Sequence, residues 1–305
     1  MAFSATDAAF EGFRLVRRNP LALVAWTLLY ALLTLTTVFS LARVAGPMAD
    51  LIVKAEALEG VTRPPPEQIM ALMADFGVVM SQVLWLAPVS LVVGAMLSAA
   101  VARGVLKPSG DRFGYLRLGM DEVRVLAVTL VLGIVMGLAA VIGMAVLGVV
   151  FMAADAAGAG AIVRLIGFCA FLCAFVWASV RLSLAVPITV AEKRFAFFDS
   201  FGVTRGRFWP LLGMAVIVIV MVMVVQLLSV IVSLPLQVAS GLEDWTFGAG
   251  QDAEVIMAAM DVTNPWVIGH AVVEAIVAAL TVGILYAPFA AAYRDITGRA
   301  EQPSD

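Results

Sequence analysis

Two ionisable side chains of different character share one face of the last apolar stretch. His270 and Glu274 are four residues apart, so on a helix they lie one turn apart on the same side. An imidazole beside a carboxylate is the composition of a proton relay. A zinc site would need two or three more ligands, and His270 is the only histidine. The alternative is a structural ion pair between Glu274 and Arg164, which we expect at a similar depth.

Arg181 lies well inside the fourth apolar stretch, whereas Arg164 lies at the outer end of that stretch. An ionised group in a membrane span costs at least a few kcal/mol, so each one is a functional hypothesis. Arg181 lies roughly 13 Å from the inner end of its stretch at about 1.5 Å per residue, and we expect Tyr30 and Tyr286 at a similar depth. The guanidinium could bind an anionic group such as a lipid phosphate. Alternatively it is structural, satisfied by those two hydroxyls and by backbone carbonyls.

Motifs that would indicate catalysis are missing from the sequence. It contains no P-loop, no His-Glu-x-x-His and no Gly-x-Ser-x-Gly. Its two cysteines, Cys169 and Cys173, are four residues apart in one apolar stretch, where they suit packing. The sequence therefore predicts a protein that is not an enzyme, that holds no metal or cofactor and that binds no nucleic acid.

The composition identifies the elements that must position these side chains. Of 305 residues, 63% are hydrophobic and 13% are charged, whereas soluble domains have about 45–50% apolar and about 25% charged residues. A membrane span needs about 20 apolar residues. Six stretches qualify, which predicts an all-α polytopic membrane protein with a single membrane domain over residues 1–305: 20–44, 77–102, 124–153, 162–190, 209–240 and 267–293.

The positive charges orient these spans. Most of the 19 Lys and Arg residues fall in four segments that alternate with the apolar stretches: 14–18, 103–124, 193–207 and 294–299. Because loops rich in Lys and Arg stay on the cytoplasmic side, we expect six spans with the N- and C-termini both cytoplasmic. The predicted location is the inner (plasma) membrane of a bacterium.

A short basic and aromatic segment precedes each odd-numbered span, at about residues 5–18, 111–122 and 195–207. We interpret these segments as cytoplasmic interfacial elbow helices that rest on anionic lipid headgroups. If so, the chain consists of three units in a threefold internal repeat. The alternative is basic loops with stray aromatics. The i, i+3, i+7 spacing recurs in Phe10/Phe13/Arg17 and Phe198/Phe201/Arg205, while Tyr115/Leu118/Glu122 ends in an acid.

Two local patterns predict further structure. Residues 45–76 can form two short helices, Met48–Leu58 and Glu67–Phe76, around a run of three prolines. Gly133 and Gly137 form a Gly-x-x-x-Gly pattern in the third span, which is typical of close helix contact.

Three tracts carry a resemblance to a known family. They are Trp177–Pro187 with Arg181 at its centre, Ser200–Gly213, and Tyr286–Arg294 with Pro288. These tracts resemble the six-span membrane domain attached to some bacterial glycerophosphodiester phosphodiesterases, and its stand-alone YciC-like relatives. The chain departs from the former because residues 1–305 include no soluble phosphodiesterase domain. The resemblance implies an inner-membrane protein without catalytic residues.

The sequence therefore leaves two main functional hypotheses. A third, weaker hypothesis is a membrane-embedded enzyme centred on His270 and Glu274. The first is a non-catalytic inner-membrane protein, a scaffold or accessory factor in envelope or lipid homeostasis whose partners include membrane lipids. The second is a small transporter or channel for an anionic or amphipathic substrate that uses Arg181. The five candidate site residues are Arg181, Tyr30, Tyr286, Glu274 and His270.

Overall fold

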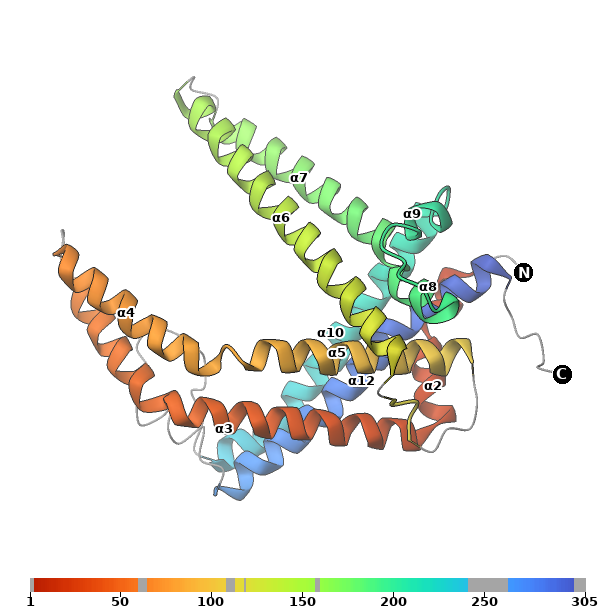
Figure 1. Ribbon diagram of the computed structural model, residues 1–305, viewed down its shortest axis with the longest axis horizontal. Coiled ribbons are helices and arrows are strands. Elements are labelled where there is room, and N and C mark those ends of the chain that lie inside the picture. Colours follow the sequence, from red (N-terminus) through yellow and green to blue (C-terminus); the bar gives the residue numbers. More distant parts are fainter. Residues whose placement is uncertain are drawn as a thin grey trace. The chain divides into compact units, whose positions relative to one another are not determined.

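The computed structural model describes residues 3–59, 65–107, 113–117, 119–156, 160–240 and 263–298, and it is 88% helical with no strand in these ranges. Its helices are shown in Figure 1. They are α1 (Ala5–Ala9), α2 (Glu11–Arg18), α3 (Pro20–Glu59), α4 (Pro66–Val83), α5 (Leu86–Leu106), α6 (Met120–Ala156), α7 (Gly160–Leu182), α8 (Ala185–Glu192), α9 (Ser200–Val203), α10 (Phe208–Ser240) and α12 (Pro265–Thr297).

Within the described residues, six helical stretches are long and apolar enough to cross a membrane, as the sequence predicted. They are Pro20–Ala55, Pro66–Leu106, Met120–Ala156, Gly160–Glu192, Phe208–Ala239 and Pro265–Thr297. Two of them contain a break. The second is divided into α4 and α5, and the fourth is divided into α7 and α8.

The predicted short helices of residues 45–76 are parts of longer ones. The helix expected at Met48–Leu58 is continuous with α3, which runs through Pro47 without a break. The helix expected at Glu67–Phe76 is the first part of α4. Proline removes one donor but leaves the rest of the helical bonds, so the pattern around Pro47 did not mark a helix end.

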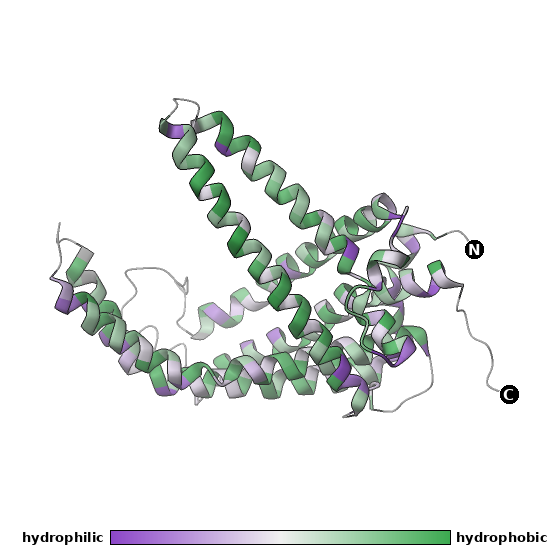
Figure 2. Ribbon diagram, turned by 45° about the horizontal axis from the view of Figure 1, so that its top comes forward, coloured by the Kyte–Doolittle hydropathy of each residue, from purple (hydrophilic) through white to green (hydrophobic). Residues whose placement is uncertain are grey.

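Large apolar side chains are exposed along the spans. Ile134, Leu138 and Val141 on α6 are 53–67% exposed, and Ile162 and Leu165 on α7 are similar. Figure 2 shows the hydrophobic colour along most of the α6–α7 hairpin. Soluble proteins rarely expose continuous apolar surfaces of this kind, and a helix that is apolar all round belongs in a core or in lipid. These helices therefore fit a bilayer.

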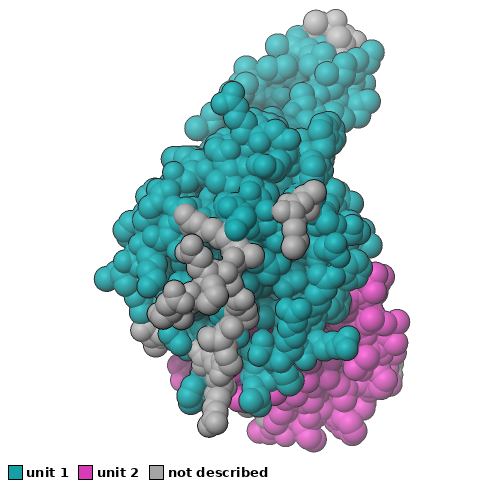
Figure 3. All heavy atoms as spheres, turned by 90° about the vertical axis from the view of Figure 1, so that its right-hand side faces the viewer, with its two compact units in different colours: residues 1–22, 94–222, 282–305 teal, residues 23–93, 223–281 magenta. Residues whose placement is uncertain are grey.

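The chain forms two compact units, drawn in different colours in Figure 3. Unit 1 contains residues 1–22, 94–222 and 282–305, and unit 2 contains residues 23–93 and 223–281. Helices α3, α5, α10 and α12 contribute residues to both units. The division therefore falls within helices and not at linkers, and the single membrane domain stays a prediction.

The α6–α7 hairpin of unit 1 packs through glycines other than the predicted pair. A Cβ atom added to Gly143 would lie 2.5 Å from the Phe171 ring, and one added to Gly167 would lie 3.0 Å from the Phe151 ring. Among the described residues, nothing lies within 4 Å of such an atom at Gly133 or Gly137. The glycines that matter are those opposite an aromatic side chain.

The three predicted elbows have different local structures. The first is helical, as α1 and α2. The third contains only the four-residue α9. Within the second, residues 113–117 form a turn, Gly114 and Tyr115 have positive φ, and α6 begins at Met120. The prediction of an elbow helix is thus wrong for residues 113–117, while residues 111, 112 and 118 lie outside the described ranges.

The first elbow is packed directly on the backbone of α12 near the middle of that helix. A Cβ atom added to Gly12 of α2 would lie 2.6 Å from the carbonyl oxygen of Gly283 and 2.7 Å from Cα of Ile284. Both are backbone atoms, which cannot rotate away as a side chain would. Gly12 is therefore required for this contact.

The substitution Gly12→Ala should lower the free energy of unfolding by about 1–3 kcal/mol, the usual range for overpacking. The measurement is thermal unfolding of the purified protein in detergent. Gly202→Ala is the matched control, because nothing lies within 4 Å of a Cβ atom there. Equal stability of the two variants would contradict the close α2–α12 contact.

Candidate functional site

Arg181 lies at the break in the fourth span and not deep within a continuous helix. Helix α7 ends at Leu182 and α8 begins at Ala185. Pro187 cannot donate to the carbonyl of Ser183, which accounts for the break. The Ser200 hydroxyl bridges the ends: it donates to the carbonyl of Arg181 at 2.5 Å and accepts from the backbone nitrogen of Leu184 at 3.2 Å.

The guanidinium of Arg181 is held by the segment that contains α9. Its Nη1 lies 3.4 Å from the carbonyl oxygen of Phe201 and 3.4 Å from Oγ1 of Thr204. Its Cζ lies 5.6 Å from the centre of the Trp177 ring, within the range of a cation–π contact. These groups replace the tyrosine hydroxyls that we expected, because the break brings residues 200–204 beside the end of α7. Arg181 thus has a structural set of partners.

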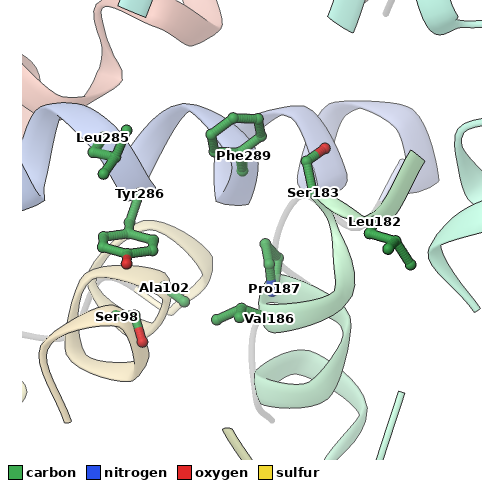
Figure 4. Close-up of a pocket in the computed structure, with 9 residues that line it drawn as sticks. All are labelled: Ser98, Ala102, Leu182, Ser183, Val186, Pro187, Leu285, Tyr286 and Phe289. Carbon is green, nitrogen blue, oxygen red and sulfur yellow. The ribbon is translucent and has the colours of Figure 1, made fainter. Parts of the chain in front are cut away.

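Tyr286 borders an apolar pocket of about 310 Å³ in unit 1. Its ring projects from α12 toward α5 (Figure 4). The Ser98 and Ser183 hydroxyls donate to carbonyls of their own chain segments, at 3.1 and 2.8 Å, so they add little polarity to the wall. We call this cavity the apolar pocket; its lining consists of Ser98, Ala102, Leu182, Ser183, Val186, Pro187, Leu285, Tyr286 and Phe289.

The remaining candidates belong to unit 2. Tyr30 lies on α3, and His270 and Glu274 lie on α12. Glu274 accepts a hydrogen bond of 3.3 Å from the Ser229 hydroxyl. Arg164, its expected partner, instead pairs with Asp155 at 2.9 Å. Asp155 precedes Arg164 by only nine residues across the α6–α7 turn, so this local pair forms readily.

The surroundings of His270 do not form a nucleophile and base. The Ser229 hydroxyl is bonded to Glu274 and not to the imidazole, whereas an activated nucleophile needs contact with its base. Nδ1 of His270 is buried and has no hydrogen-bond partner among the described residues. Nor do these residues bring together three or more His, Cys, Asp or Glu side chains that could hold a metal ion.

An ion pair that sequence reasoning missed fixes the turn between α5 and α6. Arg103 and Glu122 lie 2.5 Å apart, with their side chains only 13% and 7% exposed. Arg103 also donates to the carbonyl of Tyr115 at 2.7 Å, and the backbone nitrogen of Gly119 donates to Glu122 at 2.9 Å. The last contact is half of a capping box at the start of α6. The sequence did contain a sign of this ion pair. Glu122 occupies the last position of the i, i+3, i+7 spacing, where the other two basic and aromatic segments have an arginine.

A second buried carboxylate joins the two ends of the chain. Glu11 of α2 lies 3.4 Å from Arg14, 3.9 Å from Arg18 and 3.7 Å from Arg294 of α12. Because α2 and the end of α12 share this carboxylate, the N- and C-terminal helical ends lie together in unit 1.

Glu192 forms a third centre of the same kind. It accepts from the Tyr293 hydroxyl at 3.1 Å and from Arg194 at 2.7 Å. Tyr293 lies on α12 and is only 1% exposed. We define the basic end of unit 1 as the region around Glu11, Glu122 and Glu192, where each carboxylate is matched by at least one arginine.

Replacing Arg181 should destabilise the protein. Arg181→Ala removes two charged hydrogen bonds and a cation–π contact, so we expect a loss of about 1–3 kcal/mol. Thermal unfolding in detergent measures it. Arg205→Ala is the control, because Arg205 is exposed on the same segment. If both variants unfold at the same temperature, Arg181 does not hold the α9 segment.

Comparison with known proteins gives a family but no activity. No curated protein and no solved structure matches the chain. A family model described as a domain of unknown function matches residues 5–296, nearly the whole of the membrane-spanning region and the basic end. The protein therefore belongs to the DUF7847 family.

Proposed function

We propose that the protein is a non-catalytic integral protein of the bacterial inner membrane, a scaffold or accessory factor in envelope or lipid homeostasis. The observation that carries this proposal is the set of hydrogen bonds that the Arg181 guanidinium makes within the protein. Nη1 of its guanidinium is bonded to Phe201 and Thr204 of its own chain, and its Nε is buried without a hydrogen-bond partner among the described residues. A ligand-binding arginine would instead present its donors to an opening.

The arrangement of the basic end supports a cytoplasmic position for both termini. Glu11 and Arg294 bring α2 and the end of α12 together, and the Lys/Arg-rich segments of the sequence belong to this end. Aromatic side chains at an interface suit the headgroup boundary, while arginines suit anionic phosphates. We infer that anionic membrane lipids are partners here through exposed residues that include Phe10, Phe13, Arg17, Phe198 and Arg205.

The second candidate function is a transporter or channel for an anionic or amphipathic substrate. The apolar pocket beside Tyr286 is the observation in its favour. Its substrate could not use Arg181 without displacing the contacts to residues 201 and 204. The resemblance to the membrane domains of glycerophosphodiester phosphodiesterases is compatible with either function and remains part of the proposal.

Complementation of a deletion strain tests the proposal. With each variant adjusted to equal membrane abundance, we expect Arg181→Ala, His270→Ala and Glu274→Gln to restore growth under envelope stress as well as the unchanged protein. Growth under detergent or osmotic challenge is the measurement. Failure of Arg181→Ala at equal abundance would favour transport, and failure of both the His270 and Glu274 variants would favour an enzyme.

Reporter fusions test the orientation. Alkaline phosphatase fused after Ala156 should be active, because the end of α6 is expected on the outer side of the membrane. Green fluorescent protein at the C-terminus should fluoresce, because that end is expected in the cytoplasm. The reverse pattern of the two reporters would overturn the orientation and leave the six spans intact.

A further inference from the structure

We propose that unit 1 contains a binding site for one anionic phospholipid, with the phosphate in a basic pocket and part of an acyl chain in the apolar pocket. The site goes beyond the scaffold function and does not depend on it. A lipid held there is compatible with a scaffold or with a transporter. It is distinct from the diffuse attraction of exposed arginines to headgroups, because two defined cavities are lined by neighbouring residues of the same two helices, α5 and α8.

The basic pocket lies between the end of α5, the end of α8 and the turn before α6. Its volume is about 130 Å³, which is room for about four water molecules at about 30 Å³ each and therefore for a phosphate group. Four cationic side chains and one carboxylate line it: Arg103, Lys107, Arg117, Lys193 and Asp121.

The charges of this pocket do not cancel. Asp121 is paired with Arg124 at 2.7 Å, and Arg103 is paired with Glu122. No carboxylate of the described residues forms an ion pair with Lys107 or Lys193. Nε of Arg103 is also buried and donates to none of the described residues. The pocket therefore has two uncompensated ammonium groups and one spare donor, a set that suits a phosphate.

The backbone of Lys193 points to a role for its side chain. Lys193 ends α8 with φ of 52°, in the left-handed region. Helices usually place glycine at such a position because a side chain is strained there. Tyr115, whose carbonyl accepts from Arg103, has φ of 62°. Strained non-glycine residues cluster at functional sites. Lys193 lines the basic pocket, and the Tyr115 carbonyl holds Arg103, which also lines it.

The apolar pocket and the basic pocket are lined by neighbouring residues of α5 and of α8. On α5, Ala102 lines the apolar pocket and Arg103 lines the basic one. On α8, Val186 and Val190 belong to the two pockets and lie one turn apart. Val186 and Val190 are thus separated by about 6 Å along α8 at about 1.5 Å per residue. A phosphate joined through glycerol to an acyl chain has this arrangement of charge and hydrocarbon.

The basic pocket and the apolar pocket together favour a phospholipid over other ligands. A soluble phosphate would use the basic pocket alone, and a neutral lipid would use the apolar pocket alone. The apolar pocket of about 310 Å³ is at the lower end of the range for ligand pockets, about 300–1,000 Å³, and its wall in Figure 4 presents mainly hydrocarbon. Basic pockets between membrane helices on the cytoplasmic side bind anionic headgroups. A phospholipid of the inner leaflet satisfies both halves.

The test is binding of defined lipids to the full-length, delipidated protein, measured by native mass spectrometry. We expect one phosphatidylglycerol to be retained in preference to phosphatidylcholine. Lys107→Ala combined with Lys193→Gly should weaken phosphatidylglycerol binding by about 25-fold, about fivefold for each lysine. Glycine suits the left-handed backbone at position 193, so folding should be preserved. Arg43→Ala combined with Arg207→Ala removes the same charge at two other exposed positions and should leave binding unchanged.

A second variant tests the apolar half. Val186→Trp should fill the apolar pocket and weaken phosphatidylglycerol binding while leaving the binding of inorganic phosphate unchanged, and Val186→Ala is its control. Thermal unfolding of every variant separates loss of binding from loss of folding. Lys193→Asn, also tolerant of the left-handed region, replaces Lys193→Gly if the glycine variant unfolds.

Four results would overturn the proposal. The first is equal retention of phosphatidylglycerol and phosphatidylcholine, and the second is an equal loss of phosphatidylglycerol binding in the control arginine variants. The third is unchanged phosphatidylglycerol binding when the pocket lysines are replaced in a protein that still folds. The fourth is full competition by inorganic phosphate together with unchanged phosphatidylglycerol binding in Val186→Trp. The second would assign the binding to diffuse surface charge, and the fourth to a soluble anion. None of them bears on whether the protein is catalytic.

Discussion

The hydrocarbon of a bilayer offers no hydrogen-bond partner, so a chain that crosses it must satisfy its own charged groups and broken helical turns. The basic end of unit 1 follows from this requirement. Glu11, Glu122 and Glu192 are each matched by arginines, and the Ser200 hydroxyl serves both sides of the break between α7 and α8. Removing one partner of the buried Arg103–Glu122 pair leaves an uncompensated charge, which is strongly destabilising. Together these contacts connect α2 with α12, α5 with α6, and α7 with α8.

The spans could be predicted from sequence because their signal is local. The length of a span can be read from the number of consecutive apolar residues in the sequence. Helices α6 and α10 match the predicted stretches within a few residues. The surroundings of Arg181 could not be predicted, because its partners at residues 201 and 204 follow about 20 positions later. Their approach depends on the direction that the chain takes after Pro187. The Glu11–Arg294 contact joins opposite ends of the sequence and has no local signal at all.

The three segments that share the aromatic and basic i, i+3, i+7 spacing have three different structures. In α2 the spacing belongs to a helix that Gly12 allows to approach the α12 backbone. Before α6 it belongs to a turn held by Arg103, and in the third segment it spans the four-residue α9. The repeated spacing therefore predicts that a segment precedes a span, but it does not predict the backbone conformation of that segment. Tertiary partners decide the local structure in each copy.

The shared carboxylate of Glu11 also has a consequence for biosynthesis. A ribosome makes Glu11 well before Arg294, and the Gly283 backbone that Gly12 contacts is likewise made after the first five spans. A chain that stops before the sixth span lacks both partners, so its α2 carries a partly paired carboxylate and a glycine surface that no backbone covers. We expect membrane proteases to degrade such fragments. The contact between α2 and α12 thus distinguishes a chain that includes the sixth span from one that stops before it.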